Sequence, residues 1–303
     1  MLPRSVSTAC LAGVALACSV LLACEESYPP PPPPPVFVPP APSASATGLV
    51  AAEPAARAPV AARPVLDDFE WAALDPRTSR MRQRATALLV VEIQGLEQLL
   101  AATPRPSRDR PAILRRLAED YVELEHGAER DRVAAQGHRQ DGIARQKGMV
   151  ANAARRTAIK EYTALIEDYD TDPRLDEVFY DLALEDLQAG DDAQARRALH
   201  DLTTRFPDSR LVPSAAFLEG WLLSIAATAD AASYRPAEEA FARAAGSSDA
   251  LVAPVALRRL AWVARLAGDA TAADEASRRL TSTYPASEAA AHPLAAGPGP
   301  STP

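Results

Sequence analysis

An internal repeat constrains the fold of this chain more than any other feature of its sequence. The segments that begin at Gly190 and Gly268 both carry an alanine 5 residues later, a leucine 12 residues later and a proline 17 residues later. Both segments close with an aromatic residue followed by Pro-x-Ser. A unit that recurs in this way indicates similar elements stacked side by side, each burying its apolar face against the next. The upstream parts also match, with Phe179, Leu182 and Ala183 aligned with Leu257, Leu260 and Ala261.

The repeat resembles the tetratricopeptide repeat, a helical hairpin with a leucine and a small residue on its first helix and an alanine and a closing proline on its second. With two weaker copies, the shared alanine recurs at Ala158, Ala195, Ala237 and Ala273, in steps of 37, 42 and 36 residues. These long steps and the closing motif resemble periplasmic members, such as the lipoprotein of β-barrel assembly and the Tol–Pal coordinating protein. The resemblance implies an all-α fold, a right-handed superhelix of antiparallel helical hairpins.

Prolines and glycines divide the chain into about nine expected helices. Apolar residues make up 48% of the chain but aromatic residues only 5%, which favours closely packed helices over sheets. The first helix carries an apolar stripe that indicates a buried capping helix, and a short coiled coil that drives oligomerisation is the alternative. The expected helices span 80–102, 109–136, 144–169, 174–189, 191–205, 212–228, 236–245, 251–267 and 269–283.

The first hairpin is expected to be much longer than the others. Ala118 and Ala158 lie 40 residues apart, whereas the corresponding alanines of the clearest repeats lie 12 apart. The 28 extra residues predict about four additional turns, or ~20 Å, in each helix, with the tip at 137–142. Residues 128–160 are rich in basic residues, whereas residues 161–192 are acidic. Either these charges neutralise one another across packed helices, or the basic residues form an arm that binds an anionic surface. The arm residues are Arg130, Arg132, Arg139, Arg145 and Lys147.

The N-terminus carries a membrane-targeting pattern. Arg4 precedes an apolar run that ends in Leu-Leu-Ala-Cys24, which resembles the signal of bacterial lipoproteins. The resemblance implies that residues 1–23 are removed, that Cys24 receives a lipid, and that the protein faces the periplasm, with Glu25 favouring the outer membrane. An uncleaved anchor is the alternative, because about 18 apolar residues can just span a bilayer. All three cysteines lie at or before position 24, so the mature chain would hold no thiol.

Three further segments follow from composition. Residues 24–66 are rich in proline and alanine and are expected to form an extended spacer after the lipidated cysteine. Residues 67–291 are expected to form the helical domain, and 292–303 a disordered tail. Trp71 lies outside the repeats, where it would cap the helical domain or belong to a short linear motif.

Catalytic motifs are missing from the sequence. The four histidines have no metal-ligand spacing, and no phosphate-binding glycine loop or nucleophile motif occurs. We therefore expect no enzymatic activity, no cofactor and no metal. The net charge is −8, and removing residues 1–23 takes away one arginine and no acid, which leaves −9 and disfavours nucleic acid as a partner.

The remaining chemistry is that of a binding surface. In tetratricopeptide solenoids the first helices of the hairpins line a concave face, so the resemblance implies a site for envelope proteins or their peptide segments. The expected function is a membrane-anchored scaffold. An accessory factor of a cell-wall, polysaccharide, secretion or motility machine and an oligomeric coiled-coil protein are the alternatives. Trp221 and Trp262 are equally compatible with the core. The expected face comprises Arg115, Glu119, Tyr180, Phe217, Trp221, Arg258, Trp262 and Arg265.

Overall fold

The structure is a computed structural model that describes residues 65–77, 84–227 and 230–294. The chain divides into two units, Met1–Val60 and Ala61–Pro303, and all described residues belong to the second. The predicted signal peptide, Cys24 and nearly all of the spacer lie outside the described residues, as does most of the tail. Throughout the described ranges the regular structure is helical and no strand occurs, which confirms the predicted all-α class.

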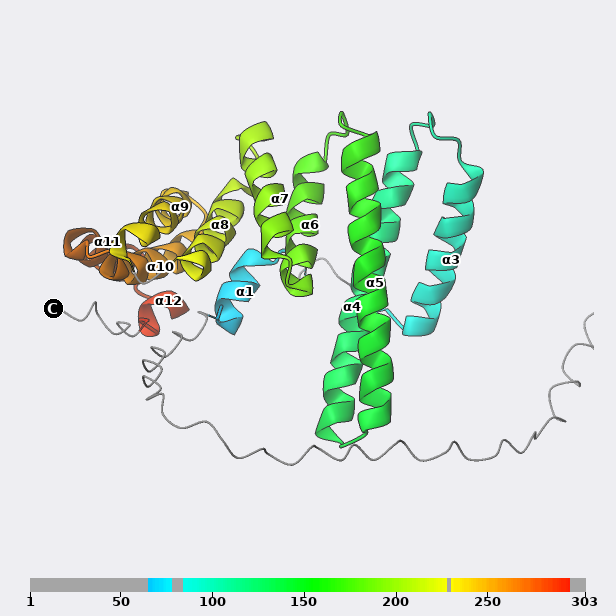
Figure 1. Cartoon of the computed structure of the whole chain (residues 1–303), viewed down its shortest axis with the longest axis horizontal. Helices are drawn as coiled ribbons and strands as arrows, with labels where there is room; N and C mark the ends of the chain where they lie inside the picture. Colours follow the sequence, from blue (N-terminus) through cyan, green and yellow to red (C-terminus); the bar gives the residue numbers. More distant parts are fainter. Residues whose placement is uncertain (1–64, 78–83, 228–229, 295–303) are drawn as a thin grey trace, which may run out of the picture. The chain divides into compact units, whose positions relative to one another are not determined.

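Eleven α-helices occur in the described part of the chain, two more than expected (Figure 1). The additional helices, α1 and α12, are short and lie outside the repeats. The helices are α1 (Asp68–Leu74), α3 (Thr86–Ala102), α4 (Arg110–Gly137), α5 (Asp141–Asp168), α6 (Leu175–Ala189), α7 (Asp192–Arg205), α8 (Val212–Ala226), α9 (Arg235–Ala245), α10 (Val252–Leu266), α11 (Ala270–Thr283) and α12 (Glu288–Ala291), with a 3-10 turn η1 (Ala231–Tyr234) before α9.

Successive helices pair into the hairpins α4–α5, α6–α7, α8–α9 and α10–α11, and each hairpin packs against the next. The four repeated alanines are at most 1% exposed, as expected of small residues that let helices approach closely. Gly220 serves the same purpose in α8, because a Cβ atom there would lie 3.1 Å from the ring of Phe241 in α9. The packing of consecutive hairpins is that of a tetratricopeptide superhelix.

The two clearest repeats share the same turn between their helices. Gly190 and Gly268 both have φ of 81°, a left-handed conformation that glycine adopts without strain and that ends the first helix. The next residues, Asp191 and Asp269, begin the second helix by accepting a hydrogen bond from the backbone N–H three positions later. The glycine in the sequence repeat is therefore explained by backbone geometry.

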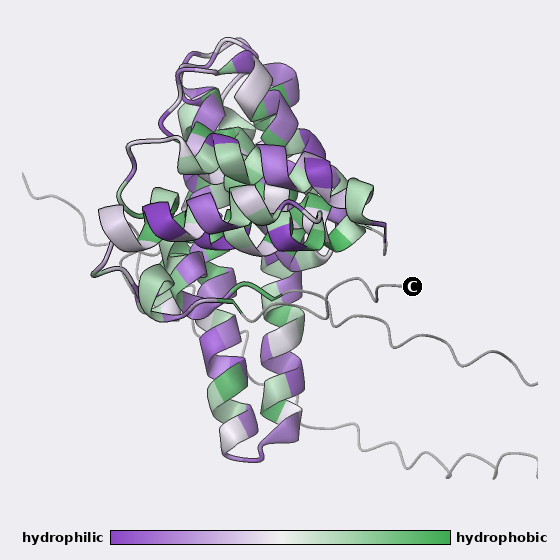
Figure 2. Cartoon of the chain, turned by 90° about the vertical axis from the view of Figure 1, so that its left-hand side faces the viewer, coloured by the Kyte–Doolittle hydropathy of each residue, from purple (hydrophilic) through white to green (hydrophobic). Residues whose placement is uncertain are grey.

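The first hairpin has the predicted additional length. Helices α4 and α5 contain 28 residues each, and the chain reverses at residues 138–140, within the predicted tip. Figure 2 shows that the projecting end of this hairpin mixes apolar turns with hydrophilic ones. Val133, Ile143 and Met149 are more than 45% exposed there.

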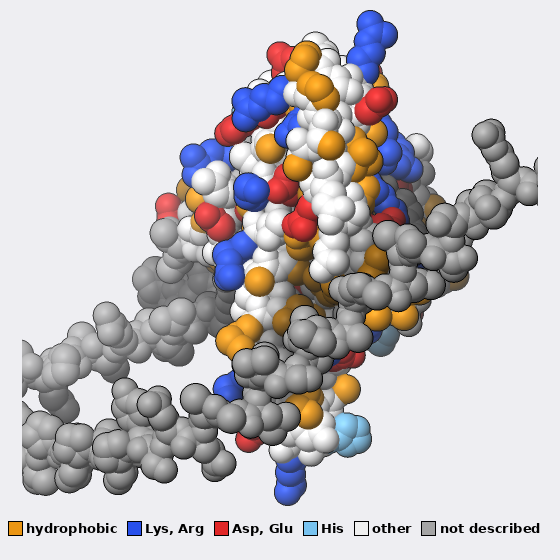
Figure 3. All heavy atoms as spheres, turned by 90° about the vertical axis from the view of Figure 1, so that its right-hand side faces the viewer, with side chains coloured by type: hydrophobic (Ala, Val, Ile, Leu, Met, Phe, Trp, Pro, Cys, Tyr) orange, Lys and Arg blue, Asp and Glu red, His pale blue; other side chains and the backbone are white. Residues whose placement is uncertain are grey.

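Helix α3 caps the helical stack on one face and exposes the other. Leu89 and Ile93 pack with Leu117 of α4, which agrees with the predicted buried stripe. Leu88 and Val91, on the opposite side of the same helix, are 68% and 66% exposed. Figure 3 shows hydrophobic side chains exposed among charged ones on this side of the molecule.

Candidate functional site

The N-terminal segment, defined here as residues 65–77, lies along the first helices of the hairpins (Figure 1). We call the surface formed by α4, α6, α8 and α10 the first-helix face. Val65 contacts α10, Trp71 contacts α8, and Leu74 and Arg77 contact α6. Beyond residues 78–83, Arg84 contacts α4. The chain therefore crosses this face in the direction opposite to the order of the repeats.

A buried carboxylate joins the N-terminal segment to α10. The Glu70 side chain is 0% exposed, and its Oε1 accepts hydrogen bonds from Arg259 Nε at 2.7 Å and from Arg258 Nη1 at 3.0 Å. Its Oε2 accepts from the backbone N–H of Asp67 at 2.9 Å, which also fixes the start of α1. Arg258 pairs in addition with the carboxylate of Asp67 at 2.7 Å. Two arginines thus hold one helical turn of the segment by charge-assisted hydrogen bonds.

Apolar and aromatic contacts fix the same segment further along. The rings of Trp71 and Trp221 meet edge to face, with centroids 6.5 Å apart. Phe69 lies 4.9 Å from the guanidinium of Arg258, within cation–π range. Leu74 is fully buried, and its carbonyl oxygen accepts a hydrogen bond from the hydroxyl of Tyr180 at 2.5 Å.

The segment ends in a buried acidic cluster on α4 and α6. Arg77 donates to Glu185 and, through Nε at 3.0 Å, to Asp75. Burial opposes the charge of Arg77, but the two carboxylates raise the pKa of its guanidinium well above the usual value. Arg155 of α5 donates to Glu125 of α4. The cluster therefore brings two arginines from distant elements against a pair of glutamates.

The carboxyl group of Glu125 lies against that of Glu185 in this cluster. Burial, together with a hydrogen bond between the two carboxyl groups, raises the pKa of Glu125 to about 8. The Oε2 atoms of both residues are buried and receive no N–H or hydroxyl donor from the described part of the chain. A hydrogen bond between two carboxyl groups requires a proton on one of them, which is why the pair favours the protonated form of Glu125.

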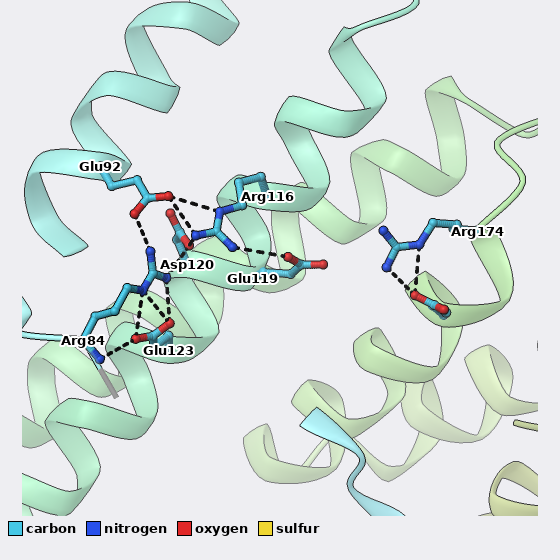
Figure 4. A network of polar contacts seen from close by, with 8 residues as sticks. Arg84, Glu92, Arg116, Glu119, Asp120, Glu123 and Arg174 are labelled. Atoms are coloured by element: carbon cyan, nitrogen blue, oxygen red, sulfur yellow. Dashed lines mark hydrogen bonds and ion pairs between the residues drawn. The ribbon is translucent and has the colours of Figure 1, made fainter. Parts of the chain in front are cut away.

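A cavity of about 560 Å³ lies beside the end of the segment, between α4 and α6. Arg77, Glu119, Tyr162 and Asp181 contribute to its wall. Figure 4 shows the ionic network along one side, in which Arg84 donates to Asp120, Glu123 and Glu92. Arg116 bridges Glu92 and Asp120 in the same network. The cavity is therefore polar and carries charges of both signs.

The structure removes two residues from the predicted binding face. Tyr180 and Phe217 are 0% exposed, because Tyr180 lies beneath Leu74 and Phe217 packs edge to face against Phe241 at 5.2 Å. The prediction that these two residues present accessible side chains is wrong. Their burial makes them part of the core.

The other predicted face residues differ in accessibility. Trp221 and Arg258 are buried with the N-terminal segment against them, and Arg115 is buried in an ion pair with Asp172. Glu119 and Trp262 are half-buried, and Arg265 is exposed. A partner could reach the last three without any change in the structure.

The residues that hold the segment are absent from the predicted binding face, namely Glu70, Leu74, Arg77 and Arg259. The signal available was weak. Asp67-Asp68-Phe69-Glu70-Trp71 is an acidic and aromatic cluster just before the repeats, but its position gives no indication of which surface it contacts.

The basic arm is partly neutralised within its own hairpin. Lys147 pairs with Asp131 at 2.6 Å, and Arg132 pairs with Glu129. Arg130, Arg139 and Arg145 are exposed at or near the projecting end. The structure thus brings the five predicted residues onto one hairpin and leaves three of them exposed.

Comparisons agree with the repeat assignment. The family model described as Tetratricopeptide repeat matches residues 177–209 and 255–287, which cover α6–α7 and α10–α11. These two segments are tetratricopeptide repeats, the class that serves as protein-interaction scaffolds. No curated protein and no solved structure matches the chain.

Within the described ranges no helix is long and apolar enough to cross a membrane. The same ranges contain no group of three or more His, Cys, Asp or Glu side chains arranged to hold a metal ion.

Proposed function

We propose that this protein is a non-catalytic scaffold of the bacterial cell envelope, anchored by a lipid on Cys24, that binds protein partners through its helical repeats. The observation that carries the binding role is the first-helix face itself, which holds a seven-residue helix through Glu70, Trp71 and Leu74. A surface that holds one helix of its own chain has the chemistry to hold a helix of another.

The sequence before the described residues supports the anchoring role. Leu-Leu-Ala-Cys24 follows an apolar run, and a proline-rich spacer of about 40 residues separates it from the repeats. At ~3.1 Å per residue where extended, this spacer would place the binding face as much as ~120 Å from the lipid. The partner is then a protein of the periplasm or of the outer membrane.

Lipidation is tested with matched cysteine variants of the full chain. Cys24→Ser should abolish incorporation of a fatty-acid analogue and cleavage at this site, whereas Cys18→Ser should leave both unchanged. Affinity capture from detergent-solubilised envelopes with the parent chain then tests partner binding. Full labelling of the Cys24→Ser variant would refute the anchor, and the absence of any captured protein would refute the scaffold.

Helix α3 favours self-association as a second candidate function. Leu88, Val91 and Leu99 form an exposed stripe, and Gly95 lies in the middle of it, where an added Cβ atom would meet open space. Such a stripe would let two copies pair through α3. Sedimentation of the parent and of Val91→Lys tests this. A monomeric parent at micromolar concentration excludes the candidate.

A further inference from the structure

We propose that residues 67–74 are an internal competitor of the partner, and that the first-helix face recognises a short partner helix with the same chemistry. That chemistry is an acidic residue next to an aromatic residue, with a leucine one turn later, as in Glu70, Trp71 and Leu74. The proposal rests on the protein-binding function proposed above and adds to it the class of ligand and its regulation.

Helix α1 resembles a bound peptide, because it is short and flanked by extended residues. It has seven residues, and the residues on either side, Asp67 and Asp75, are extended. An isolated helix of this length is unstable in water, so its helical form depends on the surface that holds it. The hairpin helices, by contrast, pair with a neighbour in sequence. Helix α1 is therefore held by tertiary contacts with α6, α8 and α10, as a bound helical peptide would be.

The charge of the face specifies an acidic ligand. Arg258 and Arg259 are adjacent, buried residues of α10. Among the described residues, the carboxylates that pair with them belong to Asp67 and Glu70 of the N-terminal segment. If the segment leaves, two cations lose their counter-ions, which is costly in a buried site. A partner that displaces the segment must therefore bring a carboxylate of its own.

The aromatic contacts favour an aromatic residue at the ligand position that follows the acidic one, which Trp71 occupies here. Trp71 meets Trp221 edge to face and is only half-buried, so its exchange for another aromatic side chain requires no opening of the core. Leu74, by contrast, is fully buried, and its carbonyl oxygen accepts the hydrogen bond from Tyr180. The face thus distinguishes an acidic-aromatic helix with a leucine from a merely acidic peptide.

Linkage to the same chain makes the segment a strong competitor. Short linkers hold a ligand at an effective concentration on the order of millimolar. A free peptide of equal affinity therefore binds poorly to the parent chain and well to a chain whose own segment is weakened. Glu70→Ala, Trp71→Ala and Leu74→Ala, combined in the full chain, define the open variant, in which the first-helix face is unchanged.

The test uses a fluorescent peptide of residues 65–77 and measures anisotropy. The peptide should bind the open variant at least about tenfold more tightly than the parent. The same peptide with Glu70→Gln and Trp71→Ala should lose most of this binding. Failure of the parent peptide to bind a folded open variant would overturn the proposal, and so would an open variant or parent that dimerises by exchanging segments.

If the open variant does not fold, amide hydrogen exchange of the parent chain provides a second test. Amides of α1 should exchange by local opening at least about tenfold faster than those of α6, α8 and α10. Equal exchange would show that α1 opens only with the whole fold, and would overturn the proposal. Peptide binding without any captured envelope protein would contradict the proposed function alone.

Discussion

Glu70 accepts a hydrogen bond from Nε of Arg259 at 2.7 Å across 189 residues of sequence, with both side chains buried. This contact joins the residues just before the repeats to the last hairpin. It defines how the N-terminal segment occupies the first-helix face.

Glu70→Gln should destabilise the fold by about 2–3 kcal/mol, because removing one partner of a buried ionic group leaves the arginines without full compensation. Asp68→Asn is the matched control, since Asp68 is exposed in the same helix and should change stability by less than about 0.5 kcal/mol. Urea unfolding of both variants measures the difference. Equal midpoints would contradict the role given to Glu70.

Ala195→Trp and Ala273→Trp should each destabilise by more than ~1 kcal/mol, because both alanines are buried where helices cross. Arg196→Lys, at an exposed position beside Ala195, should have almost no effect. Thermal unfolding compares the three variants. If all of them melt with the parent, the repeat register is wrong.

Glu125 should make the fold less stable as the pH rises. Its pKa is raised to about 8, so between its unfolded value near 4.5 and about 8 the folded state binds more protons than the unfolded state. The free energy of unfolding therefore falls across this window. Glu125→Gln should match the parent near pH 5 and exceed it by about 1 kcal/mol or more at pH 9.

Glu129→Gln is the control for this pH dependence, because Glu129 is partly exposed and its hydrogen bond from Arg132 lowers its pKa. This variant should keep the fall in stability between pH 5 and 8. Urea titrations at several pH values measure both slopes. A Glu125→Gln variant that retains the parent slope would contradict the raised pKa of Glu125.

Reversal of Arg130, Arg139 and Arg145 to glutamate should change the free energy of unfolding by less than about 0.5 kcal/mol, because all three side chains are exposed. Capture of envelope partners should persist above ~0.15 M salt, where screening reaches ~8 Å. If the charge-reversed variant captures no partner, the partner binds the basic arm. The same conclusion follows if capture by the parent falls steeply as the salt concentration rises.

The sequence was sufficient to predict the repeats because their geometry is local. Gly190 and Gly268 occupy the same left-handed turn, and the long first hairpin follows from the spacing of Ala118 and Ala158. These features depend on helix caps and on periodicity, which neighbouring residues determine.

The occupied face could not be predicted in the same way. The pairing of Glu70 with Arg258 and Arg259 joins residues almost 190 positions apart, and no periodicity connects them. Tyr180 and Phe217 occupy first-helix positions that the resemblance assigns to the open face, but tertiary packing buries both. A single sequence shows which helix a residue belongs to, whereas the covering of a helix face by a distant segment depends on the whole fold.

Capture of envelope proteins by the parent and by the open variant tests the central claim most directly. The open variant, with Glu70→Ala, Trp71→Ala and Leu74→Ala, should capture at least about tenfold more of the partner, because its own segment no longer competes for the first-helix face. Addition of excess peptide of residues 65–77 should then release that partner. Equal or lower capture by a folded open variant would contradict the account.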